Sequence, residues 1–136
     1  MLGEQIGQES GQTTGMRVLP GDGVGGVKVE VSFQHTGTLL GILGSTIGTY
    51  VSETRPDGSL YGEGQGAFMT EDGEVAAWKG SGVGQFTGRG TAVSWRGAIY
   101  FQATSERLAR LNGIAALFEN DIDETGKSED RTYEWK

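Results

Sequence analysis

Glycines recur at every second position in two segments of this chain. Residues 62–66 read GEGQG, and residues 80–84 read GSGVG. Residues two apart share one face of an extended strand, so each run removes the side chains from one face. A bare face lets a strand bend strongly, or lets a large side chain lie flat against its backbone. The pattern therefore favours a small, tightly curved β-barrel.

Most of the chain is typical of strands separated by turns rich in glycine and aspartate. The clearest strand is 27–35, VKVEVSFQH, where apolar and polar residues alternate as in a strand with one buried face. Turns are indicated by PDG at 56–58, EDG at 71–73 and ETG at 124–126. Further strands are expected within 3–19, 38–54, 59–70, 74–88, 91–104, 113–121 and 131–136.

These patterns predict an all-β fold, a closed antiparallel barrel of about eight strands. One short helix is expected near 105–111, where Ser105 stands at a cap position and Leu108 and Leu111 form an apolar edge. No long helices alternate with the strands, which argues against a parallel α/β fold. A β-sandwich is the alternative, and the bare glycine faces favour closure. We expect one β-barrel domain over residues 1–136, a usual length for a single domain.

Composition narrows the classes of function. The chain has no cysteine, which excludes disulfides, thiolate metal sites and cysteine catalysis and agrees with a cytoplasmic location. Its net charge of −7 disfavours nucleic acid and anionic membrane surfaces as partners. We also expect no membrane span and no signal peptide, because the required apolar stretches are absent from the sequence.

Two glycine-containing motifs resemble ligand loops without meeting their requirements. GDGVGG at 21–26 matches G-x-G-x-x-G, but it follows Pro20 and precedes a strand, whereas a dinucleotide site needs a strand before it and a helix after it. DIDETG at 121–126 resembles the start of a calcium loop, but position twelve is Thr132 in place of glutamate. Both are interpreted as turns. With a single histidine in the chain, we expect no metal site and no cofactor.

The single histidine, His35, follows Phe33 on the apolar side of its strand, close to the predicted strand end. This position predicts a place at the rim of the core. There it is either a hydrogen-bonded structural residue or a general base that titrates near neutral pH.

The strand over 60–70 leaves the direction of its polar residues open. Tyr61, Glu63 and Gln65 lie on the face opposite the glycines. If the glycine face packs outward, Glu63 and Gln65 point into the barrel, and a desolvated carboxylate there suits proton transfer. If the glycine face points inward, they are surface residues, which is the favoured interpretation. Glu119 raises the same question on the strand over 113–121.

Aromatic side chains are abundant for a barrel of this size. Trp78, Trp95 and Tyr100 are chief among them, and they either fill the interior or line an apolar pocket. The candidate ligand-binding residues are Gln65, Trp78, Trp95, Tyr100 and Glu119. The candidate catalytic residues are His35, Glu63 and Tyr61.

Three segments together resemble a group of uncharacterised bacterial proteins of this size. They are GSLYGEGQGAFMTEDGE at 58–74, GVGQFTGRG at 82–90 and SWRGAIYFQ at 94–102. The order of elements along the chain, about eight antiparallel strands with glycine-rich hairpins and a short helical break, is similar to that of allene-oxide-cyclase-like barrels. That resemblance implies a barrel fold whose members include cyclases that fold a reactive, apolar substrate in the lumen. It carries over no functional residue.

The leading hypothesis is a barrel that binds a small, largely apolar ligand in its interior. The alternatives are a cofactor-free cyclase or isomerase that acts in the lumen, and a structural barrel that oligomerises without a ligand. We expect a homo-oligomer, because many strands lack a well-charged outer face. Whether the protein is an enzyme stays open at this point.

Overall fold

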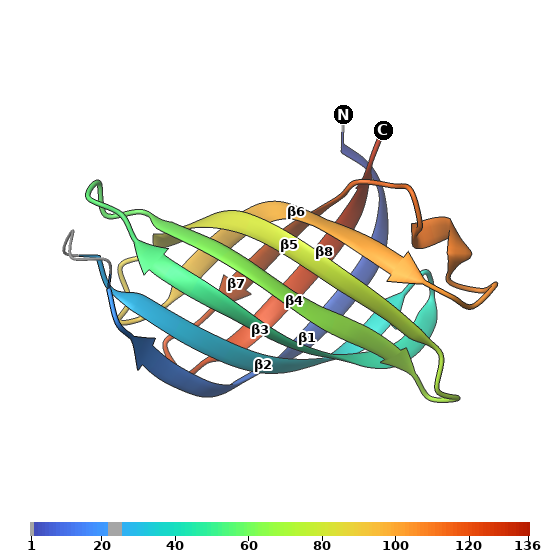
Figure 1. Cartoon of the computed structure of the whole chain (residues 1–136), viewed down its shortest axis with the longest axis horizontal. Helices are drawn as coiled ribbons and strands as arrows, with labels where there is room; N and C mark the ends of the chain where they lie inside the picture. Colours follow the sequence, from blue (N-terminus) through green and yellow to red (C-terminus); the bar gives the residue numbers. More distant parts are fainter. Residues whose placement is uncertain (1, 22–25) are drawn as a thin grey trace.

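The computed structural model of this chain describes residues 2–21 and 26–136, and most of the predicted turn at 21–26 lies outside them. Eight strands form a closed antiparallel barrel (Figure 1). They are β1 Leu2–Leu19, β2 Lys28–Leu39, β3 Ile42–Thr54, β4 Leu60–Thr70, β5 Val75–Phe86, β6 Val93–Ala103, β7 Ala116–Ile122 and β8 Lys127–Trp135. Each strand pairs with the next one in sequence, and β8 pairs with β1. The predicted barrel is confirmed, and the sandwich alternative is wrong.

The predicted glycine turns occur where the sequence places them. Gly58, Gly73 and Gly126 adopt φ values of 88°, 89° and 88° between consecutive strands, a left-handed conformation that glycine takes without a steric cost. The sequence does not indicate the turn between β2 and β3 in this way, because its first left-handed residue is Leu40, with a φ of 53°, which precedes Gly41. The predicted strand over 38–54 therefore began too early: residues 38–43 contain the hairpin turn between β2 and β3.

The glycine faces of β4 and β5 point into the barrel. The register pairs Gly62 with Gly82 and Gly64 with Gly80, so the bare positions of the two strands lie side by side. A Cβ atom on Gly62 would lie 2.9 Å from the ring of Trp95. The glycines thus make room for aromatic side chains in the lumen, and the residues between them face outward.

The segment between β6 and β7 closes one end of the barrel (Figure 1). Its two leucines, Leu108 and Leu111, are fully buried against Ile6, Leu39 and Phe68. Apolar side chains at this end thus form a core cluster that shields the interior from water.

The predicted helix near 105–111 is a single 3-10 turn, η1, over Ala109–Leu111. Ser105 does not cap it: Leu108 is the capping residue, and it makes no side-chain hydrogen bond. The turn is held from outside instead, because Arg107 forms ion pairs with Asp72 and Glu74 in the β4–β5 turn region. Within residues 2–21 and 26–136, no helix has the length and apolarity needed to cross a membrane.

Candidate functional site

A cavity of about 110 Å³ lies inside the barrel, between the plugged end and a second apolar cluster. The second cluster consists of Leu60, Val93 and Trp95. Much of the cavity wall is aromatic, formed by Phe33, Tyr50, Trp78, Trp95, Phe101 and Phe118. The interior is therefore a largely apolar chamber.

The aromatic rings pack against one another around the wall. Tyr50 meets Trp95 edge to face at 5.5 Å between ring centroids, and Phe33 stacks on Trp78 at 6.2 Å. Such pairs fix ring orientations and add to the stability that burial gives. Bare backbone makes this packing possible, since Gly66 lies against the ring of Trp78 and Gly48 lies against the rings of Phe33 and Trp78.

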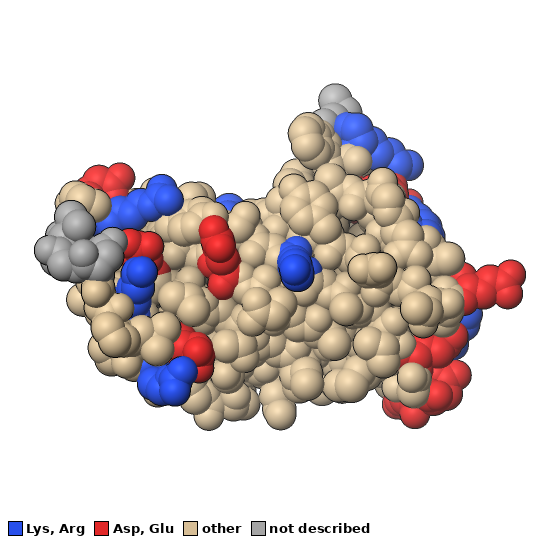
Figure 2. Space-filling view, viewed as in Figure 1, with Lys and Arg blue, Asp and Glu red and all other residues tan. Residues whose placement is uncertain are grey.

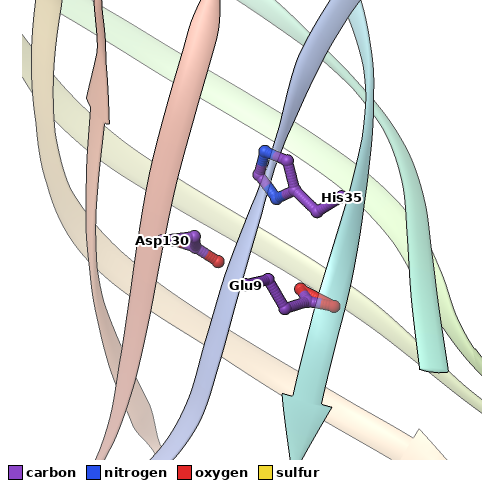
Figure 3. Close-up of side chains that lie close together, drawn as sticks. All are labelled: Glu9, His35 and Asp130. Atoms are coloured by element: carbon purple, nitrogen blue, oxygen red, sulfur yellow. The ribbon is translucent and has the colours of Figure 1, made fainter. Parts of the chain in front are cut away.

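One side of the chamber is polar. Glu9 of β1, His35 of β2 and Asp130 of β8 lie close together on three adjacent strands (Figure 3). One ligand atom from each lies within 4.8 Å of the other two. Glu9 and Asp130 are direct cross-strand partners, a placement in which like charges repel. We call Glu9, His35 and Asp130 the polar trio.

Hydroxyl groups orient two members of the polar trio. The Oγ1 of Thr46 donates to the Glu9 carboxylate at 2.7 and 3.0 Å. The Nε2 of His35 and the Oγ of Ser128 share a hydrogen bond of 2.7 Å. The Nδ1 of His35 is buried and has no partner among the described residues, so one polar atom of the trio stays available.

Burial governs the protonation of the polar trio. It raises the pKa of Asp130 to about 7, and the nearby charge of Glu9 acts in the same direction. Burial also raises the pKa of Glu9, partly opposed by its hydrogen bond from Thr46. For His35, burial lowers the pKa to about 4, so the imidazole is neutral at pH 7. The chamber therefore holds a neutral histidine beside two carboxyl groups that retain protons more strongly than usual.

Three of the residues expected to form a site lie inside the barrel: His35, Trp78 and Trp95. His35 does not lie at the rim, as its predicted strand end suggested. Because β2 continues to Leu39, His35 sits well within the strand and is only 4% exposed.

The other five predicted site residues have their side chains on the outer face. The Tyr61 hydroxyl donates to Glu63 at 2.6 Å in an exposed position. Gln65 is exposed and donates to the backbone of Thr49 on the neighbouring strand. Tyr100 is 57% exposed.

The fifth of these residues, Glu119, belongs to an outer ion-pair network with Arg96 at 3.4 Å and Arg131 at 3.7 Å. For all five the reason is the same: the glycine faces and their aromatic partners occupy the lumen, which turns the alternate positions outward. Glu63 borders the cavity between two glycines, although its side chain is exposed and accepts the hydrogen bond from Tyr61.

Sequence reasoning missed Glu9 and Asp130. A weak signal existed for Glu9, because it lies between Gly7 and Gly11 on the same face of β1, as expected of a side chain given room. No signal in the sequence indicated Asp130, because Ser128, Asp130 and Thr132 form a polar strand face of the kind that usually faces solvent.

The polar trio also has donor types that bind cations. Carboxylate oxygens and an imidazole nitrogen are ligands of zinc, which needs three or four of them. The same groups accept hydrogen bonds and exchange protons. The arrangement is thus suited to holding a cation or a hydrogen-bond donor, or to moving a proton.

Comparison with known proteins identifies the fold and leaves the activity open. No protein-family model matches the sequence, and no curated protein matches it significantly. Among solved structures, a protein of unknown function from Clostridium acetobutylicum is similar at a TM-score of 0.82, with 13% identity and 98% of each chain covered.

Two further structures show the same similarity of fold. A β-barrel-like protein from Acinetobacter baumannii is similar at a TM-score of 0.82 and 12% identity, over 100% of this chain and 96% of that one. An enzyme from Penicillium herquei is similar at a TM-score of 0.67 and 15% identity, over 96% of this chain and 92% of that one. This chain is thus a small β-barrel whose neighbours are mainly uncharacterised barrels.

Proposed function

We propose that this barrel binds a small molecule in its interior, with an apolar body against the aromatic wall and a polar end at the polar trio. The observation that carries the proposal is the chamber itself, an aromatic cavity with one cluster of converging polar groups. This combination is typical of small-molecule sites, where apolar walls supply affinity and a few polar groups set orientation.

The size of the cavity limits the ligand. A cavity of about 150 Å³ is known to take up benzene, and this chamber has about 110 Å³. We therefore infer that the ligand is small, such as a single ring or a short chain, and that a long lipid would not fit.

Titration with toluene, followed by the indole N–H signals in NMR spectra, tests this proposal. Trp78 and Trp95 line the cavity, whereas Trp135 is 58% exposed at the end of β8 and serves as an internal control. We expect saturable shifts for the two interior indoles and none for Trp135. Unchanged interior indoles at saturating toluene, together with no molecule extracted from the native protein, would contradict the proposal.

A second candidate function is cofactor-free proton transfer, as in an isomerase or cyclase. It is favoured by the direct pairing of Glu9 and Asp130 near the Nδ1 of His35, which has no partner within residues 2–21 and 26–136. A carboxylate there can take a proton from a substrate carbon while the neighbouring acid returns one to another atom. The resemblance to allene-oxide-cyclase-like barrels, and the enzyme among the structural neighbours, support this candidate at the level of fold.

Deuterium exchange into cyclopentanone, a small ketone with acidic α-hydrogens, tests the second candidate. In D₂O the wild-type protein should accelerate exchange, and Asp130→Asn should reduce the acceleration by about 100-fold or more. Glu129→Gln, which changes an exposed carboxylate of β8, is the matched control and should exchange like wild type. Equal rates for Asp130→Asn and wild type would remove Asp130 from the reaction.

A further inference from the structure

The chamber contains two carboxyl groups, and no positive side chain in its described lining balances their charge when they ionise. Its lining residues include Glu9 and Asp130, and no lysine or arginine is among those that the structure describes. Arg131 follows Asp130 in sequence, but its guanidinium pairs with Asp121 and Glu119 of the outer network. Buried carboxylates without a counter-ion carry a large desolvation cost, so they are suited to a cationic occupant.

We propose that the ligand of this barrel is a small primary amine, bound as its ammonium ion by Glu9, Asp130 and His35. This inference rests on the proposed function and specifies its ligand class. An ammonium group has three donors and no acceptor, and the polar trio offers three acceptors: two carboxylates and the Nδ1 of His35.

The spacing of the polar trio fits such a group. Acceptors that each lie about 2.8 Å from one tetrahedral nitrogen are about 4.6 Å from one another. The three ligand atoms here lie within 4.8 Å of one another. An ammonium ion can therefore contact all three acceptors with little movement of the side chains.

The hydrogen bond to Ser128 supports an acceptor role for His35. When Nε2 donates to the Oγ of Ser128, the neutral ring keeps its lone pair on Nδ1. That atom is buried and has no partner among the described residues, and in Figure 3 the carboxylates of Glu9 and Asp130 lie on the same side of the ring. A donor from the ligand would satisfy it, which removes the cost of a buried unpaired polar atom.

The aromatic wall begins next to the polar trio. The ring of Phe33 lies 4.6 Å from that of His35, and Tyr50 and Trp78 lie beyond it. Aromatic faces attract a desolvated cation and also accommodate its hydrocarbon part. A bare metal ion would use the polar trio but would leave the aromatic chamber unfilled, and its shorter bonds of about 2.0–2.2 Å would require the three ligand atoms to draw together.

The test compares each amine with the alcohol of the same shape, using the full chain and the indole N–H signals described above. The pairs are n-butylamine with 1-butanol and benzylamine with benzyl alcohol. We expect each amine to bind at least about tenfold more tightly than its alcohol. Glu9→Gln and Asp130→Asn should each remove most of that preference, and the outer-face control Glu129→Gln on β8 should keep it.

The outcomes separate this inference from the proposed function. Equal binding of amine and alcohol would overturn the amine assignment and leave the proposed function in place. Failure of amines, alcohols and toluene alike would overturn both. Tight binding of Zn²⁺ by a protein that does not bind the amines would show a metal site in place of an amine site. If one variant does not fold, the wild-type comparison of amine with alcohol still decides the question.

Discussion

Trp78 lies across Gly66, its direct partner on β4, so closely that a Cβ atom on Gly66 would be 2.4 Å from Cζ2 of the indole. The same atom would lie 2.4 Å from the backbone oxygen of Ile47. The barrel interior is thus packed with aromatic rings that require bare backbone beneath them.

We expect Gly66→Ala to lower the free energy of unfolding by about 1–3 kcal/mol, because neither the ring nor the backbone oxygen can withdraw freely. Urea denaturation measures the change. Gly15→Ala is the control, because a Cβ atom there meets nothing within 4 Å, and it should stay within about 0.5 kcal/mol of wild type. Equal stability of the two variants would contradict the packing described here.

Leu108 plugs the end of the barrel and is completely buried. Leu108→Ala should lower the free energy of unfolding by about 2–5 kcal/mol, because it removes buried methyl groups and leaves a cavity. Leu43→Ala, at a position that is 56% exposed, should change it by no more than about 0.5 kcal/mol. Thermal and urea unfolding of both variants measure these changes. A loss for Leu108→Ala no larger than that for Leu43→Ala would show that the segment between β6 and β7 does not stabilise the barrel.

Asp130 should make the folded state less stable as the pH rises. Its pKa is about 7 in the folded protein and near the ordinary value of 3.8 when unfolded, so the folded state holds a proton that the unfolded chain releases between these values. The stability is fully present below about pH 4 and is lost as the pH rises through about 7. Asp130→Asn cannot ionise, and above pH 7 it should exceed wild type by up to about 4 kcal/mol.

His35 should act in the opposite direction. Its pKa falls from 6.5 in the unfolded chain to about 4 in the fold, so its contribution is present above pH 6.5 and is lost as the pH falls toward 4. In wild type the two slopes oppose each other over this window. We expect Asp130→Asn to lose stability on acidification and His35→Gln to gain it, as measured by urea denaturation from pH 4 to 8. Parallel profiles for wild type and both variants would contradict the assigned shifts.

Self-association stays a prediction that solution measurements can check. Charged side chains gather toward the two ends of the face shown in Figure 2, and the middle of that face carries few of them. Leu43 and Ile47 of β3 are 56% and 47% exposed. If the outer face of β3 forms a contact, sedimentation velocity should show a larger species as concentration rises, and Ile47→Lys should abolish it. A monomer at every concentration would reject the expectation.

Local chemistry made much of the architecture predictable. Alternating apolar and polar residues indicate the strands, and the turns at Gly58, Gly73 and Gly126 require the left-handed conformation that glycine adopts readily. The β2–β3 turn was not predictable, because Leu40 and Gly41 sit inside an apolar stretch. The predicted helix was also too long. Its two leucines are buried at the end of the barrel, and a single 3-10 turn is enough to place them there.

The candidate site was much less predictable. Alternation states which residues share a face of a strand, but it does not state which face is inside. The directions of Glu63 and Gln65 therefore stayed open until the register placed Trp78 and Trp95 against the glycines. Glu9 and Asp130 are 121 residues apart in the sequence and meet only because β8 closes against β1.

The sequence by itself determined an all-β chain with bare, bendable strands and a supply of aromatic side chains, because those properties depend on neighbours one or two residues away. Only the tertiary structure decided which faces form the lumen and which polar groups share it. Closing the barrel joins the first and last strands and buries what lies between them, and no local pattern encodes that pairing.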